Sequence, residues 1–393
     1  MIEVIAASHP LRQLYQDGRL SQYLLLLACT AAVIGLFASR ALVALSPLVG
    51  LVAACTQPQL RTSLREWFQL RTVVSIGLLY IFLVISGVYT SEVEVWRHEV
   101  YRKLPLLVVP LAFAVAVPLN ALQRFGIGLL YVGSATALAI STLGRYLTNP
   151  EEANRLISIG HNVPAITGIF HIHFSIMHVL AYRTGLMVLY VMFFFDAIIL
   201  IVLQRRLLLG LLILVAMLGL PLVAYFTLVP IQSRVAVTLD DINQYQTGQD
   251  INDYSLAKRF AAWKTATVVA QQSPILGVGM ADVDAAMISQ YSYHDFGLRP
   301  KNWVMTHNQY LEYIVGGGTV GLLLWLLVLF GPFLQPAMRR NPYVIHFLLM
   351  MIVANLVDSL LQMQIGFNMF VFLYGFLVVG TERAARASAV LST

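Results

Sequence analysis

Residues 207–229 read LLLGLLILVAMLGLPLVAYFTLV, an unbroken apolar run of 23 residues that contains no charged side chain. A helix rises about 1.5 Å per residue and needs about 20 apolar residues to cross the hydrocarbon core of a bilayer. A transmembrane β-strand would instead alternate polar and apolar residues, and this run does not alternate. The stretch therefore predicts a membrane-spanning helix.

The composition of the whole chain points the same way. Of its 393 residues, 59% are hydrophobic and only 11% are charged, whereas soluble domains carry about 25% charged residues. A soluble enzyme, a disordered chain and a collagen-like fibre are therefore excluded. Similar apolar segments recur near residues 23–39, 41–55, 72–90, 104–119, 121–143, 186–203, 207–229, 311–334, 343–361 and 366–380. We predict an all-α fold, a polytopic transmembrane helical bundle with ten membrane helices.

The distribution of basic residues predicts which side of the membrane each loop faces. Ten crossings place both termini on one side and put residues 144–185 and 230–310 on the other. Cytoplasmic loops carry an excess of Lys and Arg. With the N-terminus inside, 12 of the 25 basic residues lie inside and 7 lie in short outer segments. We therefore predict cytoplasmic termini and one membrane domain, residues 1–393, with a first outer segment at 144–185 and a large outer loop at 230–310.

Several basic residues lie beside membrane ends on the predicted outer side. They are Arg102, Lys103, Arg145 and Arg183, joined by Arg234 and Arg259 from the large loop. Basic residues there oppose correct insertion, so as a set they favour a site that holds an anion at this face. Each one alone is better explained as a side chain that extends to lipid phosphates.

Residues 303–321, WVMTHNQYLEYIVGGGTVG, combine polar residues with the start of a membrane helix. Thr306 followed by Gln309 fits a capping box, which places His307 and Asn308 in the first helical turn. The positive end of the helix dipole disfavours an imidazolium, so His307 is predicted to be neutral and able to act as a general base. An interfacial histidine without a catalytic role remains the alternative.

Other patterns carry less weight. The pair His171 and His173 lacks the further ligands that a zinc site needs, so we expect no metal and no cofactor. The segment 274–283 contains Gly-x-Gly without a phosphate-loop lysine and is interpreted as a turn, and Gly316–Gly318 predict close helix packing. Residues 255–271 predict an amphipathic helix with Ser255 as its N-cap and with Phe260, Trp263 and Val268 near one apolar stripe.

The cysteines, the N-terminal residues and the net charge are three further features of the sequence. Cys29 and Cys55 both fall inside apolar runs, which predicts no disulfide framework. The polar first 22 residues indicate no cleavable signal peptide. The net charge of +6 would suggest a nucleic-acid partner for a soluble protein. In a membrane protein the position of the charges matters more than their sum, so nucleic acid is not expected as a partner.

Taken in order, the motifs resemble those of the O-antigen ligase and polymerase superfamily, and in particular its O-antigen ligase branch. The resemblance covers about 230–330: Arg234, a helix with Arg259 and Trp263, SPILGVG, and then THNQYLEYIVGGGTVG. Supporting matches are RKLPLLVVP at 102–110, HIHFS at 171–175 and YRTGL at 182–186.

The resemblance implies a glycosyltransferase of the GT-C type in the bacterial inner membrane, active on the periplasmic side without a metal. The donor would be O-antigen on undecaprenyl pyrophosphate, and the acceptor a sugar hydroxyl of the lipid A–core oligosaccharide, with membrane lipids around both. His307 would be the base of an inverting displacement, and Arg183 and Arg234 would clamp the pyrophosphate. Further substrate-binding residues would be Lys103, Arg102, Arg145, Arg155, Arg259, Asn308 and Glu312.

Family members usually have twelve membrane helices, with a further hairpin between the HIHFS and YRTG motifs. In this chain Met177 and His178 are adjacent, and that hairpin is missing between the two motifs. The expected number of membrane helices is therefore ten to twelve.

Two other functions fit the same sequence. An O-antigen polymerase or a protein O-oligosaccharyltransferase would share the motifs and use another acceptor. A transporter of polyprenyl-linked glycans would need broken helices with ionisable residues near the middle of the bilayer. Asp196 and Asp358 are the clearest candidates for such residues, and neither has an obvious partner in the sequence.

Overall fold

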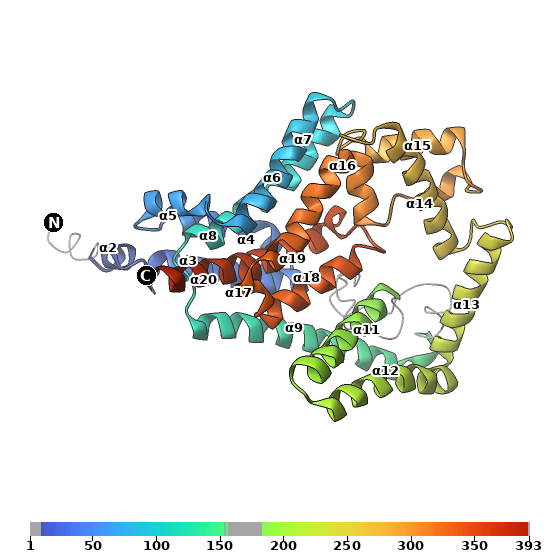
Figure 1. Cartoon of the computed structure of the whole chain (residues 1–393), viewed down its shortest axis with the longest axis horizontal. Helices are drawn as coiled ribbons and strands as arrows, with labels where there is room; N and C mark the ends of the chain where they lie inside the picture. Colours follow the sequence, from blue (N-terminus) through green and yellow to red (C-terminus); the bar gives the residue numbers. More distant parts are fainter. Residues whose placement is uncertain (1–8, 153–154, 156–182, 392–393) are drawn as a thin grey trace.

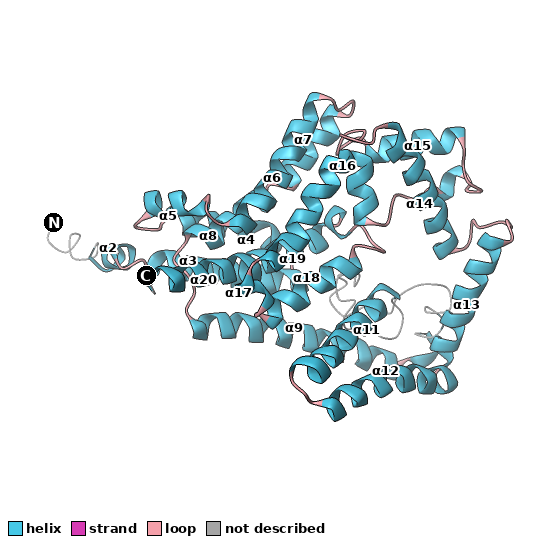
Figure 2. Ribbon diagram, in the orientation of Figure 1, coloured by secondary structure: helices cyan, strands magenta, loops and turns pink. Residues whose placement is uncertain are grey.

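The computed structural model describes residues 9–152, 155 and 183–391, and these residues form helices and loops without a strand (Figures 1 and 2). All ten predicted apolar segments are helical over most of their length. The all-α prediction is therefore confirmed for the described part of the chain.

The described residues 9–149 contain eight α-helices and one 3-10 turn. They are α2 (His9–Gln16), α3 (Arg19–Ala38), α4 (Arg40–Cys55), α5 (Leu60–Trp67), α6 (Arg71–Ile85), η1 (Ser86–Val88), α7 (Val93–Arg102), α8 (Pro105–Val115) and α9 (Ala121–Thr148). The helices after residue 182 are α11 (Arg183–Ile198), η3 (Ile199–Leu203), α12 (Leu207–Thr227), α13 (Val229–Gln246), α14 (Ser255–Gln272), α15 (Val283–Tyr293), η4 (Pro300–Asn302), α16 (Gln309–Phe330), η5 (Gly331–Leu334), α17 (Pro336–Arg339), α18 (Pro342–Ala354), η6 (Leu360–Gln362), α19 (Gln364–Leu373), η7 (Tyr374–Val379) and α20 (Gly380–Leu391).

Six helical stretches among the described residues are long and apolar enough to cross a membrane. They are Arg19–Ala38, Arg71–Val88, Ala121–Thr148, Leu207–Thr227, Gln309–Leu334 and Gln364–Val390. The pair α4 and α5, bent by 116°, makes a seventh if it is counted as one span. Met187–Leu203 and Pro342–Ala354 are shorter apolar helices. The chain is therefore a multi-pass helical membrane protein.

The main core lies where the central helices cross. Val33 of α3, Ile76 of α6 and Phe370 of α19 are fully buried there. Trp325 of α16 is also fully buried, and its ring stacks on Tyr313 with the centroids 5.2 Å apart. Inside a bilayer such packing stabilises the bundle through close van der Waals contact, because lipid is as apolar as the helices themselves.

The helices run between two ends of the molecule. At one end, the main-chain N–H groups of Arg71 and Thr72, at the start of α6, donate to the Glu382 carboxylate of α20 at 2.9 and 3.0 Å. At the other end, Arg102, which ends α7 just before α8, donates to the main-chain carbonyl of Gln362 at 2.6 Å. We call these the Glu382 end and the Gln362 end.

The large loop forms a helical layer at the Gln362 end, with α14 and α15 beside the start of α16 (Figure 1). This layer has a small core of its own, in which Met287 and Tyr291 are buried. The helix predicted at 255–271 is present as α14, but two details of that prediction are wrong. Tyr254 is its N-cap, and its buried face consists mainly of alanines, because α14 packs closely on α16 rather than presenting Phe260 and Trp263 as an apolar stripe.

Helix α16 is broken at Gly318, whose φ is +59°. Segment 274–279 lies against the break. The predicted turn at 274–283 and the close packing predicted for Gly316–Gly318 are both confirmed there. Gly277 has a φ of +71°, and a Cβ on it would overlap the carbonyl of Gly316. Four main-chain hydrogen bonds join the two segments: Val278 to Val315 (2.9 Å), Gly279 to Gly316 (3.0 Å), Thr319 to Pro274 (2.8 Å) and Val320 to Ile275 (3.2 Å). The loop backbone thus replaces the bonds that the helix loses.

Candidate active site

The start of α16 places His307 at the Gln362 end. The position of His307 relative to the first turn of this helix differs from the predicted one. Asn308 is the N-cap, and its side-chain oxygen accepts from the N–H groups of the second and third helical residues at 2.9 and 3.1 Å. His307 therefore precedes the cap and does not lie in the first turn. The predicted capping box from Thr306 to Gln309 is wrong, because Asn308 is an equally good cap and Thr306 bonds elsewhere.

The backbone at His307 is in the left-handed region, with a φ of +42°. That conformation costs about 1–2 kcal/mol for a residue with a side chain, and neighbouring bonds hold it. The N–H of Asn308 donates to the Ser359 hydroxyl at 3.1 Å, and the N–H of Gln309 donates to the carbonyl of Asn355 at 2.9 Å. Strained residues of this kind gather at functional sites.

The imidazole of His307 faces a buried carboxylate. Its Nδ1 lies 3.8 Å from Oδ1 of Asp358, and the two side chains are 40% and 6% exposed. Arg259 of α14 reaches the same Asp358 oxygen at 3.3 Å and donates to the carbonyl of Val357 at 2.7 Å. A part-exposed base with a negative charge behind it can accept a proton and have the resulting cation stabilised.

A second group of charges lies at the end of α7. The Glu99 carboxylate is 2.7 Å from the Arg102 guanidinium and 3.1 Å from the Lys103 ammonium, and the Lys103 side chain is only 4% exposed. Burial raises the pKa of Glu99, but the charges of Lys103 and Arg102 outweigh burial and hold that pKa below its usual range. These charges also act on Asp284, in the first turn of α15. Burial raises the pKa of the Asp284 carboxyl, and the charge of Glu99 raises that pKa further.

Gln362 joins this group to the segment that carries His307. Arg102 donates to the Gln362 side-chain oxygen at 2.9 Å, and the Gln362 amide donates to the buried Glu312 carboxylate at 2.9 Å. Thr306 donates its hydroxyl hydrogen to the other oxygen of Glu312. The structure therefore brings Arg102, Lys103 and Glu312 to the same end as His307.

Four other predicted site residues lie before or after the undescribed segment 156–182. Arg145 lies in the last turn of α9. Arg155 is 63% exposed and pairs with Glu152 at 2.6 Å. Arg183 begins α11 and Arg234 lies in α13, but their side chains, like the His171–His173 pair, are outside the described residues. Their convergence on His307 stays a prediction. Within the described residues, no three His, Cys, Asp or Glu side chains gather in a way that would hold a metal ion.

Part of the chain matches a known protein family. The O-antigen ligase family matches residues 169–326, which run from the HIHFS motif to beyond the break in α16. This match over part of the chain supports membership of the O-antigen ligase family. His307, Arg259 and Glu312 lie inside it, whereas Asp358 and the α7 charges lie outside.

A relative was also found, an uncharacterized protein of Haemophilus influenzae. It is 30% identical over 102 residues, which cover 26% of this chain and 25% of the relative. The match thus spans about a quarter of the relative's length.

The sequence interpretation missed the role of residues 355–362. The apolar segment predicted at 343–361 ends as a helix at Ala354, and the polar residues after it turn back toward His307. Asp358 has partners in Arg259 and His307, and Asp196 has one in His346 at 2.7 Å. The expectation that neither acid had a partner is wrong. The signal available in the sequence was a cluster of polar side chains, NLVDSLLQ, inside an apolar run.

Proposed function

We propose that this protein transfers O-antigen from undecaprenyl pyrophosphate to a sugar hydroxyl of the lipid A–core oligosaccharide. The family domain supports ligase- or polymerase-type glycosyl transfer. The observation that carries the proposal is the imidazole of His307, which is open to solvent on one side and 3.8 Å from buried Asp358 on the other.

In the proposed step, His307 removes the proton of the acceptor hydroxyl as its oxygen attacks the anomeric carbon of the donor. A new carbon–oxygen bond forms on one face of the sugar. The bond to pyrophosphate breaks on the other face and its electron pair leaves with the phosphate, so the sugar configuration inverts. Asp358 stabilises the imidazolium that forms, because the opposite charge lies close and is shielded from water.

The charge that develops on the pyrophosphate needs separate cations. We assign this role to Arg183 and Arg234, as the family resemblance implies. Arg259 already pairs with Asp358 at 3.3 Å, so we assign it a positioning role that keeps Asp358 beside His307. Lys103 and Arg102 both pair with Glu99, and we propose that they support the Gln362–Glu312 contact rather than bind the leaving group.

The proposed orientation places the Gln362 end in the periplasm. The opposite, Glu382 end carries many arginines, among them Arg61, Arg65, Arg71, Arg124, Arg383 and Arg386. An excess of arginine at one end of a bundle favours the cytoplasmic side for that end. This orientation supports a reaction in which the donor and acceptor, both lipid-anchored, meet at the outer surface of the inner membrane.

The break in α16 matches one expectation of the transporter alternative. However, the glycines at this break meet Phe82, Met280, Val283 and the backbone of residues 275–277. Among the described residues, the groups nearest to these glycines are uncharged. This favours glycosyl transfer over transport.

Purified full-length protein, given lipid-linked donor and lipid A–core, tests the proposal through the amount of ligated product. We expect His307→Ala to lose at least about a hundredfold in rate, within the usual contribution of a general base. Near-normal turnover by His307→Ala would remove the base role, and loss of turnover on metal chelation would overturn the metal-independent mechanism.

The choice of acceptor separates the related functions. The same donor is offered with lipid A–core, with a second donor molecule, or with a pilin-like protein. We expect product only with lipid A–core. Chain extension on a second donor would instead establish a polymerase, and a glycosylated protein would establish an oligosaccharyltransferase.

A further inference from the structure

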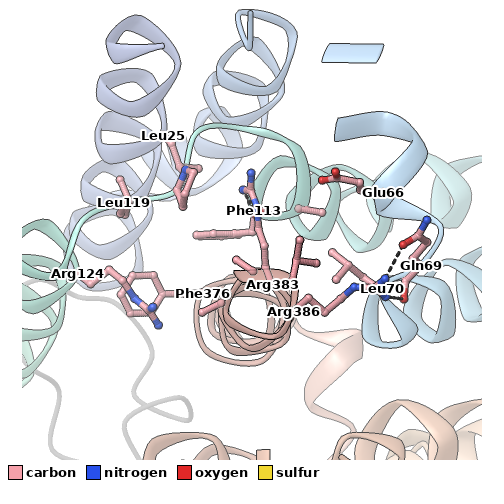
Figure 3. Close-up of a pocket in the computed structure, with 16 residues that line it drawn as sticks. Leu25, Glu66, Gln69, Leu70, Phe113, Leu119, Arg124, Phe376, Arg383 and Arg386 are labelled. Carbon is pink, nitrogen blue, oxygen red and sulfur yellow. Dashed lines mark hydrogen bonds between the residues drawn. The ribbon is translucent and has the colours of Figure 1, made fainter. Parts of the chain in front are cut away.

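A cavity of about 610 Å³ lies at the Glu382 end, far from His307. It is lined by the turn between α5 and α6, the end of α8, the start of α9 and the stretch from η7 to α20 (Figure 3). The chain from Gln362 to Arg383 spans about 30 Å at 1.5 Å per residue. The cavity is thus separate from the proposed transferase site.

Three arginines face this cavity, and each is held by neutral groups. Arg383 donates to the main-chain carbonyl of Phe113 at 3.0 Å and also to that of Ala116. These carbonyls lie at the C-terminal end of α8, where helix carbonyls have no partner within the helix. The contact places Arg383 firmly in the cavity wall without cancelling its charge.

The other two guanidiniums are held in a similar way. Arg386 donates to the main-chain and side-chain oxygens of Gln69. Arg124 lies over the ring of Phe376, with its guanidinium carbon 5.8 Å from the centroid. Glu66 is the one carboxylate among the residues that line the cavity, so three positive charges face one negative charge.

The rest of the cavity wall is apolar. Leu25, Phe113, Leu119 and Phe376 lie between and beside the arginines (Figure 3). The cavity therefore combines an anion-binding region with an apolar surface, and it lies where membrane helices end. A free anion would use only the first of these parts, whereas a lipid with an anionic headgroup would use both.

We propose that this cavity binds an anionic phospholipid of the surrounding membrane. Its phosphodiester lies beside Arg383, with Arg124 on one side and Arg386 on the other (Figure 3), because guanidinium groups bind phosphate oxygens with a planar pair of donors. An acyl chain lies along Leu25 and Phe113. Basic pockets between membrane helices are suited to such headgroups.

The test measures lipid binding to the detergent-purified full chain by native mass spectrometry, with phosphatidylglycerol and phosphatidylcholine compared at equal concentration. The key variant is Arg124→Gln with Arg386→Gln, which leaves the structural contact of Arg383 intact. The matched control is Arg61→Gln with Arg340→Gln. It removes the same charge from exposed positions outside the cavity lining.

We expect the wild type to prefer phosphatidylglycerol, the cavity variant to bind it about tenfold more weakly, and the control to stay within about twofold, given the usual effect of a basic residue near anionic lipid. Equal binding of the two lipids overturns the proposal, as does an equal loss in both variants. Inorganic phosphate is added as a competitor. Displacement of the lipid by millimolar phosphate would show that the site takes a free phosphate and overturn the lipid assignment.

Discussion

Replacement of Asp358 by asparagine removes the negative charge beside His307 and nearly preserves the shape of the side chain. Two unit charges 4 Å apart attract by about 4 kcal/mol at an effective dielectric constant of 20. The Asp358–His307 separation is 3.8 Å, but the imidazole is 40% exposed, so solvent screening weakens the attraction. If screening halves it, the imidazolium formed during the reaction loses about 2 kcal/mol, equivalent to about a 30-fold slower reaction.

The assay follows ligation rates of Asp358→Asn, His307→Ala and the double variant at saturating donor. Because Asp358 is expected to act through His307, Asp358→Asn should lower kcat with little change in KM, and the double variant should be no slower than His307→Ala alone. Multiplying losses in the double variant would refute this coupling. So would an Asp358→Asn enzyme within about twofold of the wild type.

Three further outcomes are expected. Because its two cations hold the pKa of Glu99 low, the stability that it supplies is present above the usual carboxyl pKa and is lost as pH falls through the lowered value. Thermal melting should therefore show Glu99→Gln less stable than the wild type at pH 7, and the difference between their melting temperatures should narrow toward about pH 4. A difference that stays constant with pH would contradict this reasoning. Gly277→Ala should destabilise the protein by about 2 kcal/mol or more, because Gly277 has a positive φ and a Cβ there would overlap α16. The control is Gly128→Ala, in open space on α9, which should match or exceed the wild-type melting temperature. Equal effects of the two substitutions would be incompatible with the described packing. Arg259→Lys keeps a charge near Asp358 but loses the planar pair of donors, so the ligation rate should fall severalfold while expression stays normal, and Arg259→Gln should be slower still.

The membrane helices could be predicted from the sequence because their signal is local. A run such as residues 207–229 carries enough apolar side chains to indicate a spanning helix by itself. The predicted turn at 274–283 and the close packing at Gly316–Gly318 also depended on local properties, since glycine is required where the backbone has a positive φ. The start of α16 was less certain, because Thr306 and Asn308 are both good caps and only tertiary contacts decide between them.

The site depended on contacts between distant residues. Asp358 meets Arg259 across 99 residues of sequence, and no periodicity indicates such a pair. The charged residues at the end of α7, in contrast, pair over a short distance in the sequence. Glu99 lies three and four residues before Arg102 and Lys103, a spacing that pairs opposite charges on a helix. That pairing was visible in the sequence and gives these cations a structural partner.

The break at Gly318 has a consequence for how the enzyme can move. Four main-chain hydrogen bonds fasten segment 274–279 to the interior of a membrane helix, so the layer of α14 and α15 cannot swing away from the bilayer as a hinged lid would. Because His307 directly precedes α16, its imidazole is expected to move together with this membrane helix and with the attached layer. In the proposed transferase, the lipid-anchored donor and acceptor would then reach the imidazole by diffusion within the membrane.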